Sequence, residues 1–353
     1  MKPTAELPNS NPTSDHERAA RPAAASLVLK LFLLPLAAVS VFTVTALLIS
    51  RSRHAPDDVT GLVRDLEHVD EDSWRKAYAL SQMLRSGNGI KTDAAVCREL
   101  ANVLSRQMGN PDAGPSRTRL RVFLCRALGE FHLPDGLPAL LDAAEARGDG
   151  SGVSGPDERI VRRAAVEAIA VLAANIGPEI VAADPRTVRL LLAATRAPSD
   201  DPANGTDDLR SSAAFALGVL GGTAAIDRLV ELLDDPNPNV RYNAATALSR
   251  HGDARASPVV LEMLNPENED ALRDEMTSQA REEKRAAVLR NGLRAGIRLI
   301  ASNPTVDSSK KLSKRISFLS NATTVSARTR MDAKRAVLEL RDLAHGHHGR
   351  RSE

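Results

Sequence analysis

The sequence predicts an all-α protein in which one transmembrane helix precedes an α-solenoid of about six to seven helix pairs. Three observations carry this prediction. Only 3% of the 353 residues are aromatic, and the chain is rich instead in Ala, Leu and Arg, which favour helices over strands. A 19-residue run without charge stands near the N-terminus. From residue 57 onward, a pattern of Arg, Ala and Leu recurs along the chain.

The first expected element is a transmembrane helix within residues 27–50, preceded by a polar, disordered tail over residues 1–26. Residues 31–49 carry no charge, and a helix of this length spans about 28 Å, close to the roughly 30 Å of a hydrocarbon core. Lys30 bounds the run on one side and Arg51 on the other. A cleaved signal peptide is an alternative, although its apolar region is usually only about 7–15 residues long. A buried core helix is a second alternative.

The orientation of the expected anchor does not follow from its flanks, because three Lys or Arg residues lie near each end. Two secondary signs favour a cytoplasmic solenoid. Cys97 and Cys125 form no disulfide framework of the kind used in oxidising compartments. Residues 281–353 contain 17 Lys or Arg against 7 Asp or Glu, which suits the anionic inner leaflet of a membrane.

The repeated unit is clearest around Arg241, which is followed at offsets of 3, 4, 6 and 7 by Ala244, Ala245, Ala247 and Leu248. Offsets of 3, 4 and 7 lie on one face of a helix. Alanines make that face thin, so another helix can approach closely. Arg241 is therefore treated as one of six marker arginines, each followed by a similar pattern; the other five are Arg121, Arg162, Arg210, Arg290 and Arg330.

Second amphipathic segments lie between the marker arginines, so each repeat is expected to be a pair of helices. In the clearest repeat, residues 226–233 precede the turn at residues 234–238, and glycines such as Gly221 and Gly252 separate successive pairs. The expected solenoid domain covers residues 57–344 and is followed by a disordered tail over 345–353. Its seven expected pairs are 57–86, 93–131, 135–175, 186–221, 224–252, 256–301 and 307–344.

The stretch over residues 266–298 changes from acidic to basic along its length. Acidic residues first and basic residues last suit the macrodipole of one long exposed helix that runs into the sixth pair. A charged protrusion that docks a partner is the functional alternative.

The repeat resembles a known family. Its pattern, Leu-x-x-Leu-Leu-x-Asp-x-x-x-x-Val-Arg-x-x-Ala-Ala-x-Ala-Leu-x-x-x-Gly, is similar to that of HEAT repeats, especially the short form named after phycobilisome lyases; the match is specific over residues 210–252. The resemblance implies an α-solenoid whose arginine-bearing helices line the concave side. It also implies a ladder of Asp–Arg pairs between neighbouring repeats, with Asp235 and Arg241 at the two positions. The order of anchor and solenoid resembles small membrane-anchored HEAT proteins of bacteria.

No pattern typical of catalysis, cofactor binding or metal binding stands out. Residues 150–155 fit G-x-G-x-x-G, but no strand precedes them, so a loop is expected. His132 and His251 lie at equivalent helix ends, where a partly cationic side chain meets the helix dipole. The histidines within residues 345–348 fall in the expected tail, where no metal site is expected. Cys125 lies on the Ala-bearing face of its helix and is expected to be buried.

The sequence therefore predicts a protein that is not an enzyme and that needs no cofactor or metal. We expect an integral, single-pass membrane protein whose solenoid binds an unidentified protein, with a further contact between residues 281–353 and anionic lipids. A HEAT-like lyase that handles a chromophore is one alternative. A nucleic-acid-associated protein is another, but the basic region lacks the interleaved aromatic residues that stack on single-stranded bases, and Trp74 is the only Trp.

Overall fold

A computed structural model describes residues 59–66, 73–86, 89–110, 114–146, 156–196 and 206–349. The expected N-terminal tail and transmembrane helix lie outside these ranges, so both stay predictions. Within them, none of the helices combines the length and the apolar character needed to cross a bilayer. All regular elements in the described ranges are helices, which confirms the all-α prediction.

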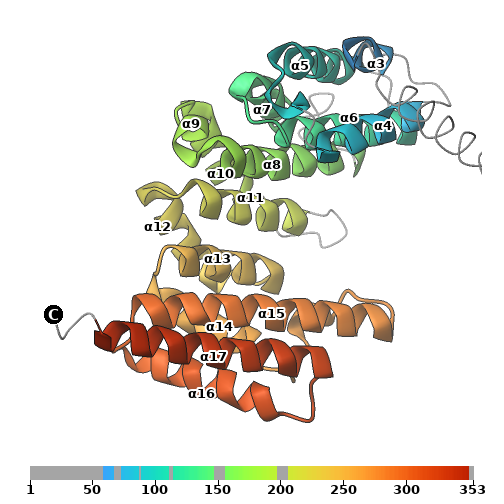
Figure 1. The fold of residues 1–353 in the computed structure, drawn as a ribbon. Coiled ribbons are helices and arrows are strands. Elements are labelled where there is room, and N and C mark those ends of the chain that lie inside the picture. The colour runs from blue at the N-terminus through green and yellow to red at the C-terminus, as the bar shows by residue number, and fades with distance from the viewer. Residues whose placement is uncertain are drawn as a thin grey trace, which may run out of the picture. The chain divides into compact units, whose positions relative to one another are not determined.

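Seven helix pairs follow one another in the described part of the chain, close to the expected positions (Figure 1). An additional short helix, α9 (Pro178–Ala182), lies between the third and fourth pairs. The pairs are α3 (Val59–Asp65) with α4 (Ser73–Ser86), α5 (Ala94–Gly109) with α6 (Pro115–Gly129), α7 (Leu137–Glu145) with α8 (Pro156–Ile176), α10 (Pro185–Ala194) with α11 (Thr206–Leu220), α12 (Thr223–Glu231) with α13 (Pro238–Arg250), α14 (Ser257–Met263) with α15 (Ser278–Ser302), and α16 (Asp307–Asn321) with α17 (Ala327–Gly349).

Local sequence signals begin and end these helices. Asp93 accepts hydrogen bonds from the amides of Ala95 and Val96 at the start of α5, and a side-chain oxygen in this position satisfies amides that the helix leaves unpaired. Between pairs, Gly221 and Gly252 adopt φ angles of 69° and 70°. This left-handed conformation ends a helix at little steric cost only for glycine, as the turn pattern predicts.

The second helices of successive pairs pack on one another, from α4 through α6, α8, α11, α13 and α15 to α17 (Figure 1). Small residues after Arg121, Arg162, Arg210 and Arg241 contribute to these contacts. Ala244, Ala245 and Ala247 are fully buried. The approach is close, because a Cβ atom added to Gly218 of α11 would lie 2.2 Å from the Cβ of Ala247 in α13. The thin helix face predicted from the alanines is therefore confirmed.

The prediction of one long helix through residues 266–298 is wrong for its first part, because α15 begins only at Ser278. Before it, Asn265 and Asn268 accept hydrogen bonds from the amides of Glu267 and Asp270. Such side-chain turns compete with helix formation. Thr277 then caps α15 by accepting a hydrogen bond from the amide of Ala280.

The acidic part of this stretch folds back onto the basic part. Glu269 pairs with Arg281 at 2.5 Å and also with Arg285, and Glu275 pairs with Lys284 at 3.0 Å. The hydrogen bond from Arg281, together with that from Arg285, lowers the pKa of Glu269. Ion pairs between the acidic residues before α15 and the basic residues of α15, rather than a single helix dipole, thus account for the change of charge along the sequence.

At the other end of the solenoid, α17 continues to Gly349. The helix thus passes the expected boundary between solenoid and tail at residue 344. Residues 327–349 contain no proline that would interrupt a helix.

Candidate functional site

The marker arginines are the first candidates, and Arg121 and Arg162 both cap the end of the preceding helix. Arg121 of α6 donates to the carbonyl of Gln107 from Nε at 3.0 Å and from Nη2 at 2.6 Å, and Nη2 also donates to Asn110 at 2.8 Å. Nε of Arg162 in α8 donates to the carbonyl of Ala144 at 3.1 Å. These carbonyls lie at the C-terminal ends of α5 and α7, where backbone acceptors lack intrahelical partners and a cation is favoured.

The two marker arginines of the last pairs differ from each other. Nη1 of Arg330 donates to the carbonyl of Val325 at 2.6 Å and to that of Ala322 at 3.4 Å, just after α16. Arg290 instead lies 3.8 Å from the carboxylate of Asp332 in α17. The marker position therefore serves either to cap the preceding helix or to reach a neighbouring one.

Arg210 and Asp235 form a buried ion pair between neighbouring repeats. Nη2 of Arg210 in α11 donates to Oδ1 of Asp235 at 2.9 Å, and the two side chains are only 4% and 9% exposed. Asp235 Oδ1 also accepts from the amide of Asn237 at 2.9 Å. The next marker, Arg241, continues the chain of contacts by donating from Nη1 to the carbonyls of Asp235 and Pro236. This geometry is a rung of an Asp–Arg ladder.

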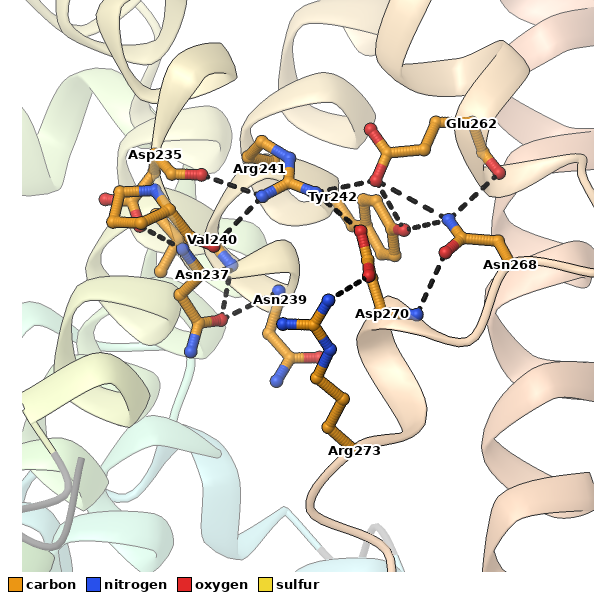
Figure 2. A network of polar contacts seen from close by, with 11 residues as sticks. Asp235, Asn237, Asn239, Val240, Arg241, Tyr242, Glu262, Asn268, Asp270 and Arg273 are labelled. Atoms are coloured by element: carbon orange, nitrogen blue, oxygen red, sulfur yellow. Dashed lines mark hydrogen bonds and ion pairs between the residues drawn. The ribbon is translucent and has the colours of Figure 1, made fainter.

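A polar network continues from Arg241 toward the sixth pair (Figure 2). Nη2 of Arg241 donates to Oε1 of Glu262 at 2.7 Å, and the hydroxyl of Tyr242 donates to the same oxygen at 2.8 Å. Nδ2 of Asn268 donates to the Tyr242 oxygen at 2.7 Å, and its Oδ1 accepts from the amide of Asp270. The network joins α13 and α14 to the turn that precedes α15.

The network holds Tyr242 in its neutral form. Burial, and next the hydrogen bond to Glu262, raise the pKa of the Tyr242 phenol well above its ordinary value. The hydroxyl donates a hydrogen bond to Glu262 and accepts one from Asn268, so its donor is already in use and its oxygen already accepts a bond. We therefore find the arrangement suited to fixing two repeats against each other. Sequence reasoning did not single out Tyr242, and its only signal was a position directly after a marker arginine.

The histidine at the end of α13 also links repeats. Nε2 of His251 lies 3.0 Å from the carbonyl oxygen of Gly218 in α11. Asn175 in α8 makes a similar contact by donating to the carbonyl of Gly129 in α6 at 3.0 Å. The structure thus places His251 at a helix end, as expected, but directs its ring to a neighbouring helix.

The two thiols are buried, and burial favours their protonated form at neutral pH. Cys97 and Cys125 are both fully buried and unpaired, as was expected for Cys125. Burial raises the pKa of each thiol to about 12, so neither supplies a thiolate nucleophile. In the part of the chain that the structure describes, no group of three or more His, Cys, Asp or Glu side chains is arranged to hold a metal ion. Residues 150–155 lie outside it.

A surface groove of about 740 Å³ lies on the second helices of the first three pairs, α4, α6 and the start of α8. Its apolar lining includes Leu84, Val122, Phe123 and Ile160, and the Ile160 side chain is 52% exposed. A hollow of this size, lined by apolar and aromatic side chains, is typical of sites that accommodate a ligand or a peptide.

Charged side chains also line the groove, three of them arginines, together with Glu130 and Asp157. Arg85 of α4 and Arg119 and Arg126 of α6 line the groove and are exposed. Arg119 donates to the carbonyl of Pro115 at 3.1 Å, whereas Arg85 and Arg126 have no ion-pair partner among the described residues. The groove therefore combines an apolar floor with two guanidinium groups that are available to a partner.

Comparison with known proteins identifies the repeats. Residues 203–280 match the family model for HEAT repeats. The phycocyanobilin lyase subunit alpha of Picosynechococcus sp. is 42% identical over 81 residues, which are 23% of this chain and 30% of that protein. This chain thus covers less than a third of the length of that curated relative.

Among solved structures, the Escherichia coli protein YibA is similar over 82% of this chain and 95% of its own, with 19% identity and a TM-score of 0.40. Human deoxyhypusine hydroxylase in complex with glycerol is similar over 81% of this chain and 96% of its own, with 15% identity and a TM-score of 0.28. The matched residues 203–280 contain Arg210, Asp235 and Arg241 of the ladder. Their match to the HEAT-repeat family model agrees with the sequence pattern over residues 210–252.

Proposed function

We propose that this chain is a membrane-anchored scaffold that binds another protein through its HEAT-like solenoid and catalyses no reaction. The groove on α4, α6 and α8 carries the proposal, because it offers apolar area together with two guanidinium groups that have no ion-pair partner among the described residues. Helix-pair solenoids commonly bind partners through extended surfaces of this kind.

The lining of the groove defines the chemistry of the partner. Phe123 and Ile160 would receive an apolar side chain, and Arg85 and Arg126 would pair with carboxylates beside it. Arginine and aromatic residues are enriched among the residues that contribute most to binding energy. The expected ligand is therefore a peptide segment of a protein partner with an apolar anchor and acidic neighbours.

The absence of catalysis is supported by the state of the reactive groups. The thiols of Cys97 and Cys125 are buried with a pKa of about 12, and Tyr242 is committed to two hydrogen bonds. A catalytic acid, base or nucleophile needs a pKa near the working pH and access to substrate. The marker arginines recur from repeat to repeat, whereas a catalytic residue need occur only once.

The binding test uses the full-length chain as bait in detergent-solubilised membrane. Ile160→Glu and Arg126→Glu change exposed groove residues, so the fold should persist. We expect each to reduce capture of the specific partner about tenfold or more, the effect of losing a dominant contact. Ile180→Glu is the matched control, because Ile180 is 45% exposed on α9 and does not line the groove. Equal capture by all variants would refute the groove as the binding site.

The anchor within residues 27–50 and the cytoplasmic solenoid are parts of the same proposal. After washing of membranes at alkaline pH with carbonate, the full-length chain should remain in the pellet. A mature N-terminus downstream of residue 40 would contradict an uncleaved anchor. Topology follows from Ser105→Cys on α5, because Ser105 is exposed while both native cysteines are buried. Labelling of intact cells by an impermeant maleimide would place the solenoid outside.

A lyase-like role is the second candidate, favoured by the 42% identity to a phycocyanobilin lyase subunit. It predicts that the purified chain binds a bilin, with a change in the visible absorption of the pigment. Our proposal predicts an unchanged spectrum. Ile160→Glu and Arg126→Glu distinguish the scaffold from the lyase-like role. If they reduce partner capture but do not change bilin absorption, the result supports the scaffold alone.

A further inference from the structure

The last helix pair exposes apolar side chains at the end of the solenoid. Phe318 of α16 and Met331 and Leu338 of α17 are 55%, 53% and 57% exposed. Large apolar side chains that gather on an exposed surface typically mark a site of interaction with a protein or a membrane.

The same helix faces are basic. On α16, the exposed residues Lys311, Lys314 and Phe318 recur every three or four positions, and Lys310 beside them is also exposed. This spacing is one stripe along a helix. The guanidinium of Arg315 lies 5.9 Å from the centre of the Phe318 ring, so charge and apolar surface are adjacent on this helix.

The stripe on α17 has the same composition. Met331 and Leu338 alternate there with Arg328, Lys334 and Arg335, all exposed. Exposed acidic residues are fewer on the two stripes than basic ones, and comprise Asp307, Glu339 and Asp342. We call this surface the basic-apolar face; it consists of Lys310, Lys311, Lys314, Phe318, Arg328, Met331, Lys334, Arg335 and Leu338.

Packing directs both stripes away from the solenoid. The opposite sides of the two helices are buried, with Leu312 and Ile316 of α16 and Ala333 and Ala336 of α17 in the core. Both helices pack on α15, and α16 also packs on α14 (Figure 1). The basic-apolar face is thus the outer side of the last pair, with no described element over it.

We infer that the basic-apolar face docks on the surface of an anionic lipid membrane. Lysine and arginine side chains are attracted to anionic headgroups. Apolar side chains on the same face enter the boundary between headgroups and acyl chains. A nucleic acid would satisfy the charges but would leave Met331 and Leu338 without an apolar environment, so the composition favours lipid. The inference rests on these side chains and not on the groove or on the expected anchor.

The test places an environment-sensitive fluorophore on the full-length chain. Both native thiols are fully buried, so a new cysteine in place of the exposed Ser317 of α16 can be labelled selectively. The probe used is a vesicle of phosphatidylcholine with about a third phosphatidylserine, compared with phosphatidylcholine alone. We expect a blue shift and brighter emission only with the anionic vesicles. The matched control carries the label at Ser105→Cys on α5 and should show no shift.

Charge variants then measure the electrostatic part. Lys311→Gln and Lys314→Gln should each lower the emission-derived partition constant about fivefold, as expected for one basic residue near an anionic surface. Arg98→Gln, on the exposed side of α5, removes one charge elsewhere and should leave the constant unchanged. Leu338→Ser should weaken partitioning while leaving its dependence on salt intact.

Three results would overturn the inference. They are equal emission with neutral and anionic vesicles, no effect of Lys311→Gln and Lys314→Gln together, and the same emission change when a single-stranded oligonucleotide replaces the vesicles. If residues 27–50 did not form a membrane anchor, the chain would float with vesicles only when these contain anionic lipid. Failure of the anchor can therefore be distinguished from failure of the basic-apolar face. If the groove bound no protein partner, the fluorescence shift of the label at residue 317 would still occur.

Discussion

At the scale of single residues, burial determines how much a marker arginine contributes to the stability of the fold. Arg210 and Asp235 are 4% and 9% exposed and hydrogen-bonded to each other, whereas Arg241 is 16% exposed and bonds mainly to backbone carbonyls and to the half-exposed Glu262. Removing one partner of a buried ion pair leaves the other charge unpaired and away from water. This lowers the free energy of unfolding far more than the loss of an exposed ion pair does. Arg210 and Arg241 occupy the same position of the repeat but are therefore expected to contribute differently to the free energy of unfolding.

Arg210→Ala should lower the free energy of unfolding by about 3–5 kcal/mol, because it leaves the Asp235 carboxylate buried without its partner. Arg241→Ala should cost less, about 1–2 kcal/mol, as for loss of charged hydrogen bonds that solvent partly replaces. Urea denaturation followed by circular dichroism measures both. The double variant Arg210→Met with Asp235→Leu is the control and should recover most of the loss. Equal costs for the two single variants would contradict the role of burial.

The buried thiols make the fold sensitive to alkaline pH. The folded chain holds Cys97 and Cys125 protonated up to a pKa of about 12, whereas an unfolded thiol loses its proton near pH 8.5. Between these values the unfolded chain binds fewer protons, so stability is full below about pH 8.5 and falls as pH rises toward 12. By pH 10 the loss should be about 2 kcal/mol for each thiol.

Urea midpoints at pH 8 and pH 10 test this dependence. Cys97→Ala with Cys125→Ala should lower stability at pH 8 by removing buried atoms, but should flatten the fall between the two pH values. Tyr242→Phe provides a comparison, because the raised pKa of Tyr242 acts at higher pH. A fall of the same size in the variant without cysteines would show that the thiols are not its cause.

At the scale of helices, close contact between second helices sets the spacing of the repeats. Gly218 of α11 faces Ala247 of α13, and Gly129 of α6 faces Ala168 of α8. In both cases the glycine follows its marker arginine by eight residues and the alanine follows the next marker by six. The small residues of the repeat therefore meet each other, and a larger side chain would push two helices apart.

Gly218→Ala should destabilise the fold by about 1–3 kcal/mol through overpacking, although alanine is the better helix former. The added Cβ would lie 2.2 Å from the Cβ of Ala247, so Gly218→Ala combined with Ala247→Gly should restore part of the loss. Gly109→Ala at the end of α5, where a Cβ would meet nothing within 4 Å, serves as the control and should change the melting temperature little. A stable Gly218→Ala variant would disprove the close approach.

At the scale of the whole molecule, each pair is held by its neighbours, so stability should rise from the ends to the centre. Helices α8, α11 and α13 have packed second helices on both sides, and their contact residues Ala165, Ala213, Ala214 and Ala244 are fully buried. Among the described second helices, α17 packs on α15 alone. The ladder and the network of Figure 2 join the fourth, fifth and sixth pairs.

Native-state hydrogen exchange should accordingly show the slowest exchange in α8, α11 and α13 and the fastest in α3 and α17. Arg210→Ala should raise the exchange rate in α11, α12 and α13 more than in α5 and α6, because the broken rung joins only the former. Mass spectrometry of peptic fragments resolves these helices. Uniform protection along the chain would instead indicate one cooperative unit.

The sequence by itself determined the all-α class, the helix pairs and the buried alanine face. These follow from local signals, because the offsets after Arg241, the caps and the glycine turns all act within a few residues. The resemblance to HEAT repeats also anticipated an Asp–Arg ladder. The sequence further predicts the membrane anchor, which lies outside the described residues and stays a prediction.

Only the tertiary structure decided which groups the repeated side chains reach. Arg210 meets Asp235 across 25 positions and Asn175 meets Gly129 across 46, and the return of Glu269 onto Arg281 and Arg285 replaces the expected long helix. The groove on α4, α6 and α8 likewise joins side chains from three repeats. The physical reason is that contacts between pairs join residues far apart in the sequence, so they depend on how the helices dock. Periodicity fixes the face of a helix but not its neighbour.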